Sequence, residues 1–243
     1  MHKEYIKINE NADKAVLFIH GIIGTPDHFV DFLPIVPQTY SVYNMLLDGH
    51  GKTVEDFCHT SMMKWKEQVN DAVEMLMKQH SHIIIVAHSM GTLFAISEAV
   101  KHPDVVKELF LLASPMKVKV KPRMLTSATK VYFGIEDDDV YADAARRTYG
   151  IPDKQNLSKY AGWVPRYREL FKEIKEARSV LKYVKAKTHV YMSMDDELVS
   201  IDSIKYLKEN KAFDIKILGK SAHFYYEESD YKKLLNEFAK IFE

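Results

Sequence analysis

Ser89 is the residue whose setting most clearly predicts chemistry. It lies in the string AHSMG (residues 87–91), directly after the apolar run 82–86 and before a helical pattern over 92–101. A serine on a sharp strand-to-helix turn has a strained backbone, so its Oγ projects above the sheet and the following N–H groups point at the same space. Small residues two positions either side let neighbouring backbone pass close by, and Ala87 and Gly91 fill those positions. We interpret Ser89 as a nucleophile.

The elements that must position this serine are apolar runs with helical patterns between them. Six runs predict strands of a mostly parallel sheet, at residues 15–19, 42–47, 83–87, 109–113, 189–194 and 213–218. Two amphipathic helical faces are marked by Trp65, Val69 and Leu76 and by Tyr231, Leu234 and Phe238. Alternation of strands and helices predicts an α/β fold with helices on both faces of the sheet.

One stretch interrupts this alternation. Residues 116–187 contain no good strand but several helical patterns, separated by turns at Gly134, 150–152 and Gly162. Roughly seventy residues are far more than a crossover between two strands needs. We therefore expect an inserted helical cap over 116–187, between a first core segment, 1–115, and a second core segment, 188–243.

Length and composition limit the class of protein. A chain of 243 residues fits one large α/β domain. The 34 Lys and Arg residues balance 34 Asp and Glu residues, so net charge predicts neither a nucleic-acid nor an anionic-membrane partner. No signal peptide or uncharged run long enough to cross a bilayer is present, which predicts a soluble, cytoplasmic protein with no integral membrane segment. The single cysteine, Cys58, fits a reducing compartment, and its polar surroundings indicate an inert thiol.

Five features together resemble the α/β-hydrolase fold. They are HGIIG at 20–24, DGHG at 48–51, the turn at Ser89, the Asp-rich turn MDDELV at 194–199, and His223 near the C-terminus. Within that fold the sequence is most similar to small bacterial carboxylesterases and monoacylglycerol lipases, over nearly the whole chain and least in the cap. The resemblance implies a serine esterase that needs no cofactor.

The resemblance also implies a catalytic set, because this fold delivers its residues in the chain order serine, acid, histidine. His223 lies between the last strand and the final helix, where the family places its base. The acid is Asp195 or Asp196, and the family register, with an aliphatic pair shortly after the acid, selects Asp196. Asp195 and Glu197 are then expected to be solvated neighbours.

The fold further implies two oxyanion donors, the backbone N–H groups of Ile22 and Met90. The residues expected to contact substrate are Ile23, Val199, Tyr132, Phe133, Trp163 and Phe171. The four aromatic residues among these lie in the expected cap with others such as Tyr149, and aromatic stripes of this kind equally form a cap's own core.

The expected reaction is hydrolysis of carboxylic esters with short to medium acyl chains, monoacylglycerols among them, through an acyl-enzyme on Ser89. A thioesterase or an acyltransferase uses the same residues, and a ligand-binding homologue without turnover is a further alternative. Metal-ligand spacings such as His-Glu-x-x-His and Gly-rich phosphate loops do not occur, so no metal and no cofactor are expected. The expected partner is a small-molecule ester, and the sequence specifies no oligomeric state.

Overall fold

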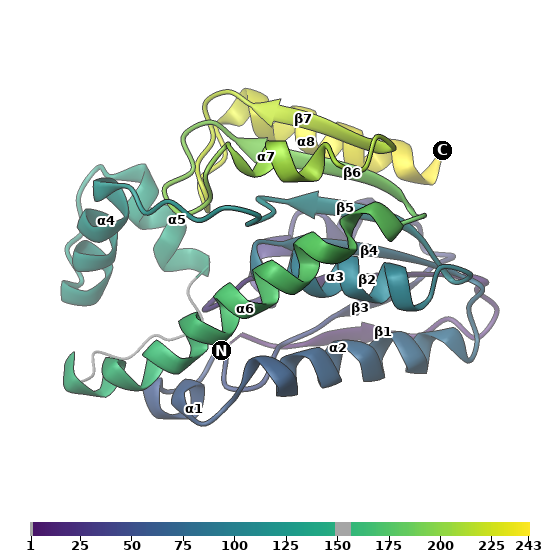
Figure 1. Cartoon of the computed structure of the whole chain (residues 1–243), viewed down its shortest axis with the longest axis horizontal. Coiled ribbons are helices and arrows are strands. Elements are labelled where there is room, and N and C mark those ends of the chain that lie inside the picture. Colours follow the sequence, from purple (N-terminus) through teal and green to yellow (C-terminus); the bar gives the residue numbers. More distant parts are fainter. Residues whose placement is uncertain (1, 149–156) are drawn as a thin grey trace.

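The computed structural model describes residues 2–148 and 157–243. Seven strands form one sheet in the order β1-β3-β2-β4-β5-β6-β7 (Figure 1). They are β1 (Tyr5–Lys7), β2 (Lys14–Ile19), β3 (Ser41–Asn44), β4 (His82–His88), β5 (Val106–Leu112), β6 (Lys187–Ser193) and β7 (Phe213–Leu218). Only the β1–β3 pair is antiparallel. The predicted fold class, a mostly parallel sheet flanked by helices, is confirmed.

Six of these strands match the apolar runs. β7 has the predicted bounds, whereas β3 ends at Asn44, before the end of its run. β1 is not predicted, because a three-residue edge strand with a mostly exposed face leaves no apolar run in the sequence.

Helices cover both faces of the sheet. The α-helices are α1 (Val54–Cys58), α2 (Met62–Met77), α3 (Met90–Lys101), α4 (Pro122–Phe133), α5 (Val140–Thr148), α6 (Val164–Val180), α7 (Ser203–Leu207) and α8 (Glu228–Ala239). Short 3₁₀ helices are η1 (Pro26–Phe29), η2 (Leu33–Ile35), η3 (Leu157–Trp163), η4 (Leu181–Tyr183) and η5 (Lys240–Phe242). None of the helices within 2–148 and 157–243 is both long and apolar enough to span a membrane.

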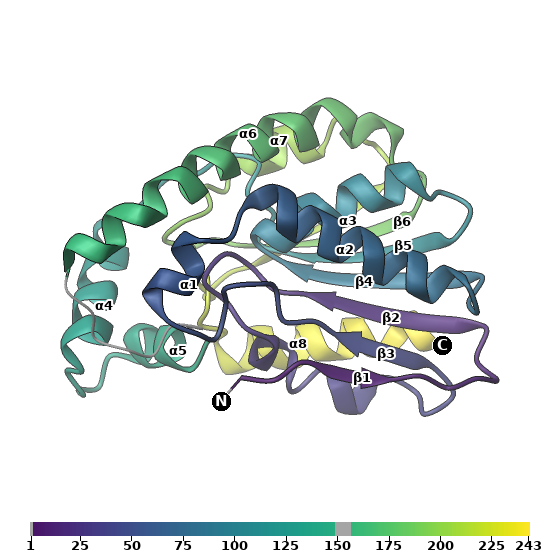
Figure 2. The same cartoon turned by 90° about the horizontal axis from the view of Figure 1, so that it is seen from below.

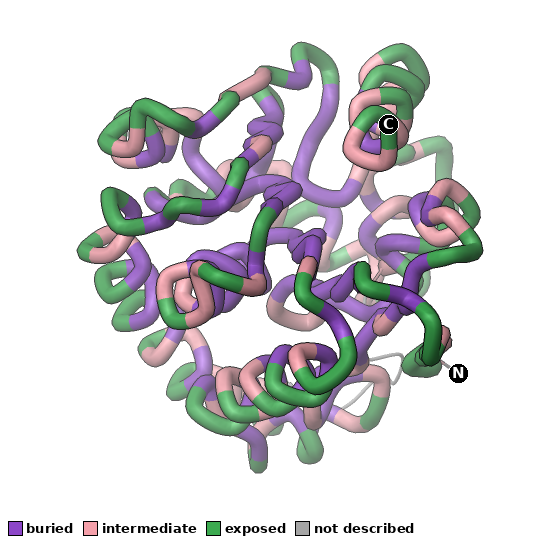
Figure 3. The backbone as a smooth tube through the Cα atoms, turned by 90° about the vertical axis from the view of Figure 1, so that its right-hand side faces the viewer, coloured by how far each residue is buried: buried purple, intermediate pink, exposed green. Residues whose placement is uncertain are grey.

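Successive strand residues enter two separate hydrophobic cores, as the period of two in a strand requires. Leu17 of β2 packs in one core with side chains of α2, α3 and α6, among them Trp65. Its neighbour Phe18 packs in the other core, with Phe238 of α8. Figure 3 shows buried positions gathered in the interior and exposed positions on the outside. Both faces of the central strands are therefore closed to water, which leaves their ends for chemistry.

The segment 116–187 has two parts. Helices α4 and α5 lie beyond the end of the sheet at which β4 and β6 finish (Figures 1 and 2). Helix α6 runs back along the sheet, where Ile174 and Ala177 belong to the same core as α3. Tyr149 and the turn expected at 150–152 lie outside the described residues.

Candidate active site

Ser89 occupies a strained turn between β4 and α3. Its φ of 51° and ψ of −123° lie in a region that residues other than glycine rarely adopt. The turn also lies against neighbouring backbone: a Cβ on Gly91 would come within 2.3 Å of the carbonyl oxygen of Ile19, and one on Gly21 within 2.8 Å of the Ser89 Cβ. The loop after β2 therefore passes directly beside the serine.

Asp196 and His223 form a buried pair. His223 Nδ1 lies 2.8 Å from Asp196 Oδ2, and both side chains are at most 2% exposed. The other carboxylate oxygen, Oδ1, accepts the backbone N–H groups of Leu198 at 2.8 Å and Val199 at 2.7 Å. A carboxylate only accepts hydrogen bonds, so His223 Nδ1 carries a proton and Nε2 is free to act as a base. Burial is the largest single influence and disfavours the imidazolium form, but the Asp196 charge, the Asp196 hydrogen bond and the Glu197 charge together raise the pKa of His223.

The loop that carries His223 is bound to the Ser89 turn. The ring of His88, the residue before Ser89, lies 4.7 Å from the His223 ring, between centroids. His88 Nε2–H donates to the His223 carbonyl oxygen at 3.0 Å. His28 of η1 stacks on His88 with centroids 3.9 Å apart. Burial lowers the pKa of His28 to about 3 and holds that of His88 well below its usual range, so both rings are uncharged near neutral pH.

The loop after β2 is oriented by a buried histidine. The backbone N–H of Leu47 donates to His20 Nε2 at 3.1 Å, so the proton of the neutral ring lies on Nδ1, which donates to the Gly21 carbonyl oxygen at 2.8 Å. Gly24 N–H donates to the same oxygen at 3.0 Å. Because a trans peptide is planar, the N–H of Ile22 points opposite to that carbonyl. Burial lowers the pKa of His20 to about 4, which preserves this arrangement near neutral pH.

The other candidate substrate residues have varied surroundings. Ile23 is half-buried in the loop after β2, with a φ of 52°, and Val199 is buried beside Asp196. Trp163 packs on Phe57, with ring centroids 5.0 Å apart, and contributes to the core under α6.

Three aromatic residues of the segment 116–187 are not among the residues of the two hydrophobic cores. Phe133 of α4 is 59% exposed and Phe171 of α6 is 57% exposed. The Tyr132 ring packs against Phe133 at 5.0 Å and against Tyr160 at 6.1 Å, between centroids. The Tyr132–Phe133 and Tyr132–Tyr160 contacts therefore lie within the helical segment itself.

One expectation is wrong. Asp195 is exposed as expected, but Glu197 is 4% exposed and is not a solvated neighbour. Its Oε2 accepts the backbone N–H of His223 at 3.1 Å and lies 3.6 Å from Arg123 Nη2. Sequence reasoning missed the contact between Glu197 and Arg123, because the two belong to segments far apart in the chain and the motif at 194–199 does not mark Glu197 as buried.

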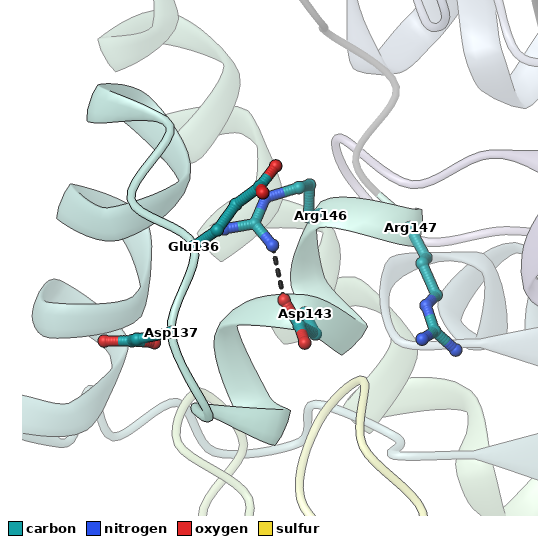
Figure 4. A pocket seen from close by; sticks show the side chains of 5 residues that line it. All are labelled: Glu136, Asp137, Asp143, Arg146 and Arg147. Carbon is teal, nitrogen blue, oxygen red and sulfur yellow. Dashed lines mark hydrogen bonds and ion pairs between the residues drawn. The ribbon is translucent and has the colours of Figure 1, made fainter.

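A hollow of about 280 Å³ lies apart from Ser89, between the loop before α5 and α5 itself (Figure 4). Its lining is entirely charged: Glu136, Asp137, Asp143, Arg146 and Arg147. Arg146 pairs with Asp143 across it. In the described parts of the chain, His, Cys, Asp and Glu side chains form no group of three or more that could hold a metal ion.

Comparison with known proteins adds a family and relatives. Residues 10–223, which include Ser89, Asp196 and His223, match the protein family described as serine aminopeptidase, S33. The probable lysophospholipase BODYGUARD 2 of Arabidopsis thaliana is 33% identical over 116 residues, which are 45% of this chain and 24% of that protein. A thermostable monoacylglycerol lipase of Bacillus sp. strain H-257 is 30% identical over 97 residues, 40% of this chain and 39% of that protein.

These alignments span less than half the length of either relative. The likeness of fold extends further. A solved structure from work on LipS and LipT, two metagenome-derived lipolytic enzymes, has a TM-score of 0.76 at 16% identity and covers 99% of this chain and 97% of that one.

Proposed function

Because the chain belongs to the serine aminopeptidase S33 family of hydrolases, we propose that it hydrolyses carboxylic esters with short to medium acyl chains, monoacylglycerols among them. One observation carries the proposal: the buried Asp196–His223 pair, whose loop is bound to the strained turn at Ser89. A serine, a base and a group that orients the base are the parts that acyl transfer requires.

The proposed mechanism assigns each part a step. Ser89 Oγ attacks the ester carbonyl while His223 Nε2 removes its proton, and Asp196 stabilises the imidazolium that forms. The N–H groups of Met90 and Ile22 bind the oxyanion. The alcohol leaves with the proton from His223, and water then releases the acid from the acyl-enzyme by the same sequence of steps.

The segment 116–187 is proposed to bound the acyl site. Helices α4 and α5 lie beyond the end of the sheet at which β4 finishes, as Figure 1 shows, and Ser89 directly follows β4 in the chain. Residues 117–121 also run beside 197–200, through a Lys119 N–H to Leu198 carbonyl bond of 2.9 Å and a Lys121 N–H to Glu197 carbonyl bond of 2.8 Å. A cap attached in this way can limit chain length without supplying catalytic groups.

Esters are favoured over the peptide bonds in the family's description because two relatives are named as lipases, a monoacylglycerol lipase and a probable lysophospholipase. The test is a substrate panel: p-nitrophenyl esters and monoacylglycerols of increasing chain length, acyl thioesters, and aminoacyl p-nitroanilides. We expect the highest kcat/KM on an oxygen ester. Highest activity on thioesters or anilides would replace the proposal with a thioesterase or a peptidase.

Covalent labelling separates an enzyme from a binding protein with the same fold. A fluorophosphonate probe should modify Ser89, located by peptide mass spectrometry, and should not modify Ser89→Ala. The probe reacts only with a serine whose base and oxyanion donors are in place. An unlabelled, folded protein would favour the binding module.

A further inference from the structure

Both backbone polar groups of His223 are held by side chains from other elements. Its carbonyl accepts from His88 Nε2 at 3.0 Å, and its N–H donates to Glu197 Oε2 at 3.1 Å. Glu197 directly follows Asp196, whose carboxylate binds the His223 ring. Two successive carboxylates in one turn therefore hold the same histidine, one by its side chain and the other by its main chain.

Glu197 has a cationic partner, as a buried carboxylate requires. Arg123, near the start of α4, lies 3.6 Å from Glu197 Oε2, between Nη2 and the oxygen. Arg123 Nη2 also donates to the Asp195 carbonyl oxygen, and its guanidinium carbon lies 3.9 Å from the centroid of the Tyr141 ring on α5. Tyr141 in turn packs on Tyr225, two residues after His223, with ring centroids 5.1 Å apart. Helices α4 and α5 are thus attached to the 194–199 turn and to the loop that carries His223.

We propose that Glu197 is a positioning residue for His223, and that Arg123 keeps its carboxylate in place. This inference rests on the proposed function, in which His223 is the base. The Asp196 bond alone leaves the histidine main chain free to shift along the loop. The Glu197 bond fixes that main chain, and with it the place of Nε2 relative to Ser89. A displacement of about 1 Å at a reacting group costs on the order of 100-fold in rate.

The charge of Glu197 gives a second, separable effect. Together with Asp196 it favours the imidazolium form and so raises the pKa of His223. The titratable and charged groups around His223 are Asp196 and Glu197 from the 194–199 turn, His88 from β4, His28 from η1, Tyr226 from its own loop and, behind Glu197, Arg123. Removing the Glu197 charge should therefore lower the pKa of His223.

Two variants separate the hydrogen bond from the charge. Glu197→Gln keeps an oxygen that accepts the His223 N–H but removes the charge, whereas Glu197→Leu removes both. Asp195→Asn is the matched control, an acid-to-amide change at the exposed neighbouring position. The measurements are kcat and KM on one ester, normalised to active sites titrated with fluorophosphonate, and the pKa of His223 followed by NMR.

Glu197→Leu should lower kcat per titrated site by ~10- to 100-fold with little change in KM, because a displaced base slows proton transfer without weakening binding. Glu197→Gln should restore kcat to within ~3-fold of wild type and lower the pKa of His223. Asp195→Asn should stay within ~2-fold of wild type in kcat.

If Glu197 had only a structural role, its substitution would change the fraction of active sites that fluorophosphonate titrates and would leave kcat per titrated site unchanged. The inference is overturned if Glu197→Leu keeps the wild-type kcat per titrated site, or if Glu197→Gln is as slow as Glu197→Leu. In either case the proposed ester hydrolysis stands. If Glu197→Leu fails to fold, an unshifted His223 pKa in Glu197→Gln overturns it. If wild type cleaves no ester and takes no label, the proposed function fails and the NMR shift alone decides the inference.

Discussion

Asp196 meets His223 with one carboxylate oxygen only. Oδ2 accepts from His223 Nδ1 at 2.8 Å, while Oδ1 is occupied by two backbone N–H donors. The carboxylate cannot rotate to exchange its oxygens without giving up these two bonds. The acid is thus fixed in place before any substrate arrives, and with it the tautomer of His223.

This arrangement predicts the effect of Asp196→Asn. The amide oxygen would take the Oδ1 position, since the two N–H groups there need an acceptor, and the amide NH₂ would face His223 Nδ1. Nδ1 would then have to accept, which moves the ring proton to Nε2 and leaves no base, so kcat should fall by ~10⁴-fold. Ester turnover compared with that of Asp195→Asn checks this, and a larger loss at Asp195 would transfer the role of the acid to that residue.

The pH profile should follow the raised pKa of His223. The base works only as neutral imidazole, so kcat/KM rises with pH as His223 loses its proton. Because the Asp196 charge raises that pKa, the midpoint of the acid limb should lie above the value of about 6.5 for a free histidine. Initial rates at constant ionic strength, corrected for spontaneous hydrolysis, give the midpoint. A midpoint below 6.5, or a limb that persists in His223→Ala, would remove His223 from the mechanism.

Gly91→Ala tests the close packing of the Ser89 turn. The new Cβ would lie 2.3 Å from the Ile19 carbonyl oxygen and 2.8 Å from that of His20, and backbone atoms cannot move aside cheaply. We expect a loss of about 3 kcal/mol in the free energy of unfolding, with a severe loss of activity. Gly219→Ala is the control, because a Cβ there meets nothing within 4 Å. Equal urea midpoints for the two variants would contradict this account of the turn.

The aromatic residues of the segment 116–187 predict a division between specificity and stability. Phe133→Ala and Phe171→Ala remove exposed rings, so the melting temperature should change little. Where the ring bounds the acyl chain, the ratio of kcat/KM for long and short esters should change by ~10-fold. Trp163→Ala, which opens the contact with Phe57, should instead cost about 2 kcal/mol of stability. Unchanged ratios at every position, Tyr132 included, would leave chain-length selection to Ile23 and Val199.

The sequence predicts features that depend on residues close together in the chain. The turn at Ser89 is recognisable because a strand, a five-residue motif and a helix follow one another without a break. Long buried strands are equally visible, since each is a run of apolar residues. β1 escapes prediction because it is short and exposed, and is a strand only through its pairing with β3.

Contacts between segments that are far apart in the chain could not be predicted in this way. Adjacent acidic residues look alike in the sequence, yet Asp195 is exposed while Asp196 and Glu197 are buried. The difference arises from His223 and Arg123, which approach this turn from other parts of the chain. The register of the resemblance singles out Asp196, but no pattern marks Glu197, because its burial depends on an arginine that only the folded chain brings near.

The central claim, that Ser89 is the nucleophile of an esterase, is tested most directly by Ser89→Ala. The substitution removes a single oxygen from the side chain and adds no atom, so the fold should persist. Turnover of p-nitrophenyl butyrate and the circular dichroism spectrum should be measured on the same sample. We predict a native spectrum with kcat reduced by ~10⁶-fold. A native spectrum with retained turnover would contradict the claim.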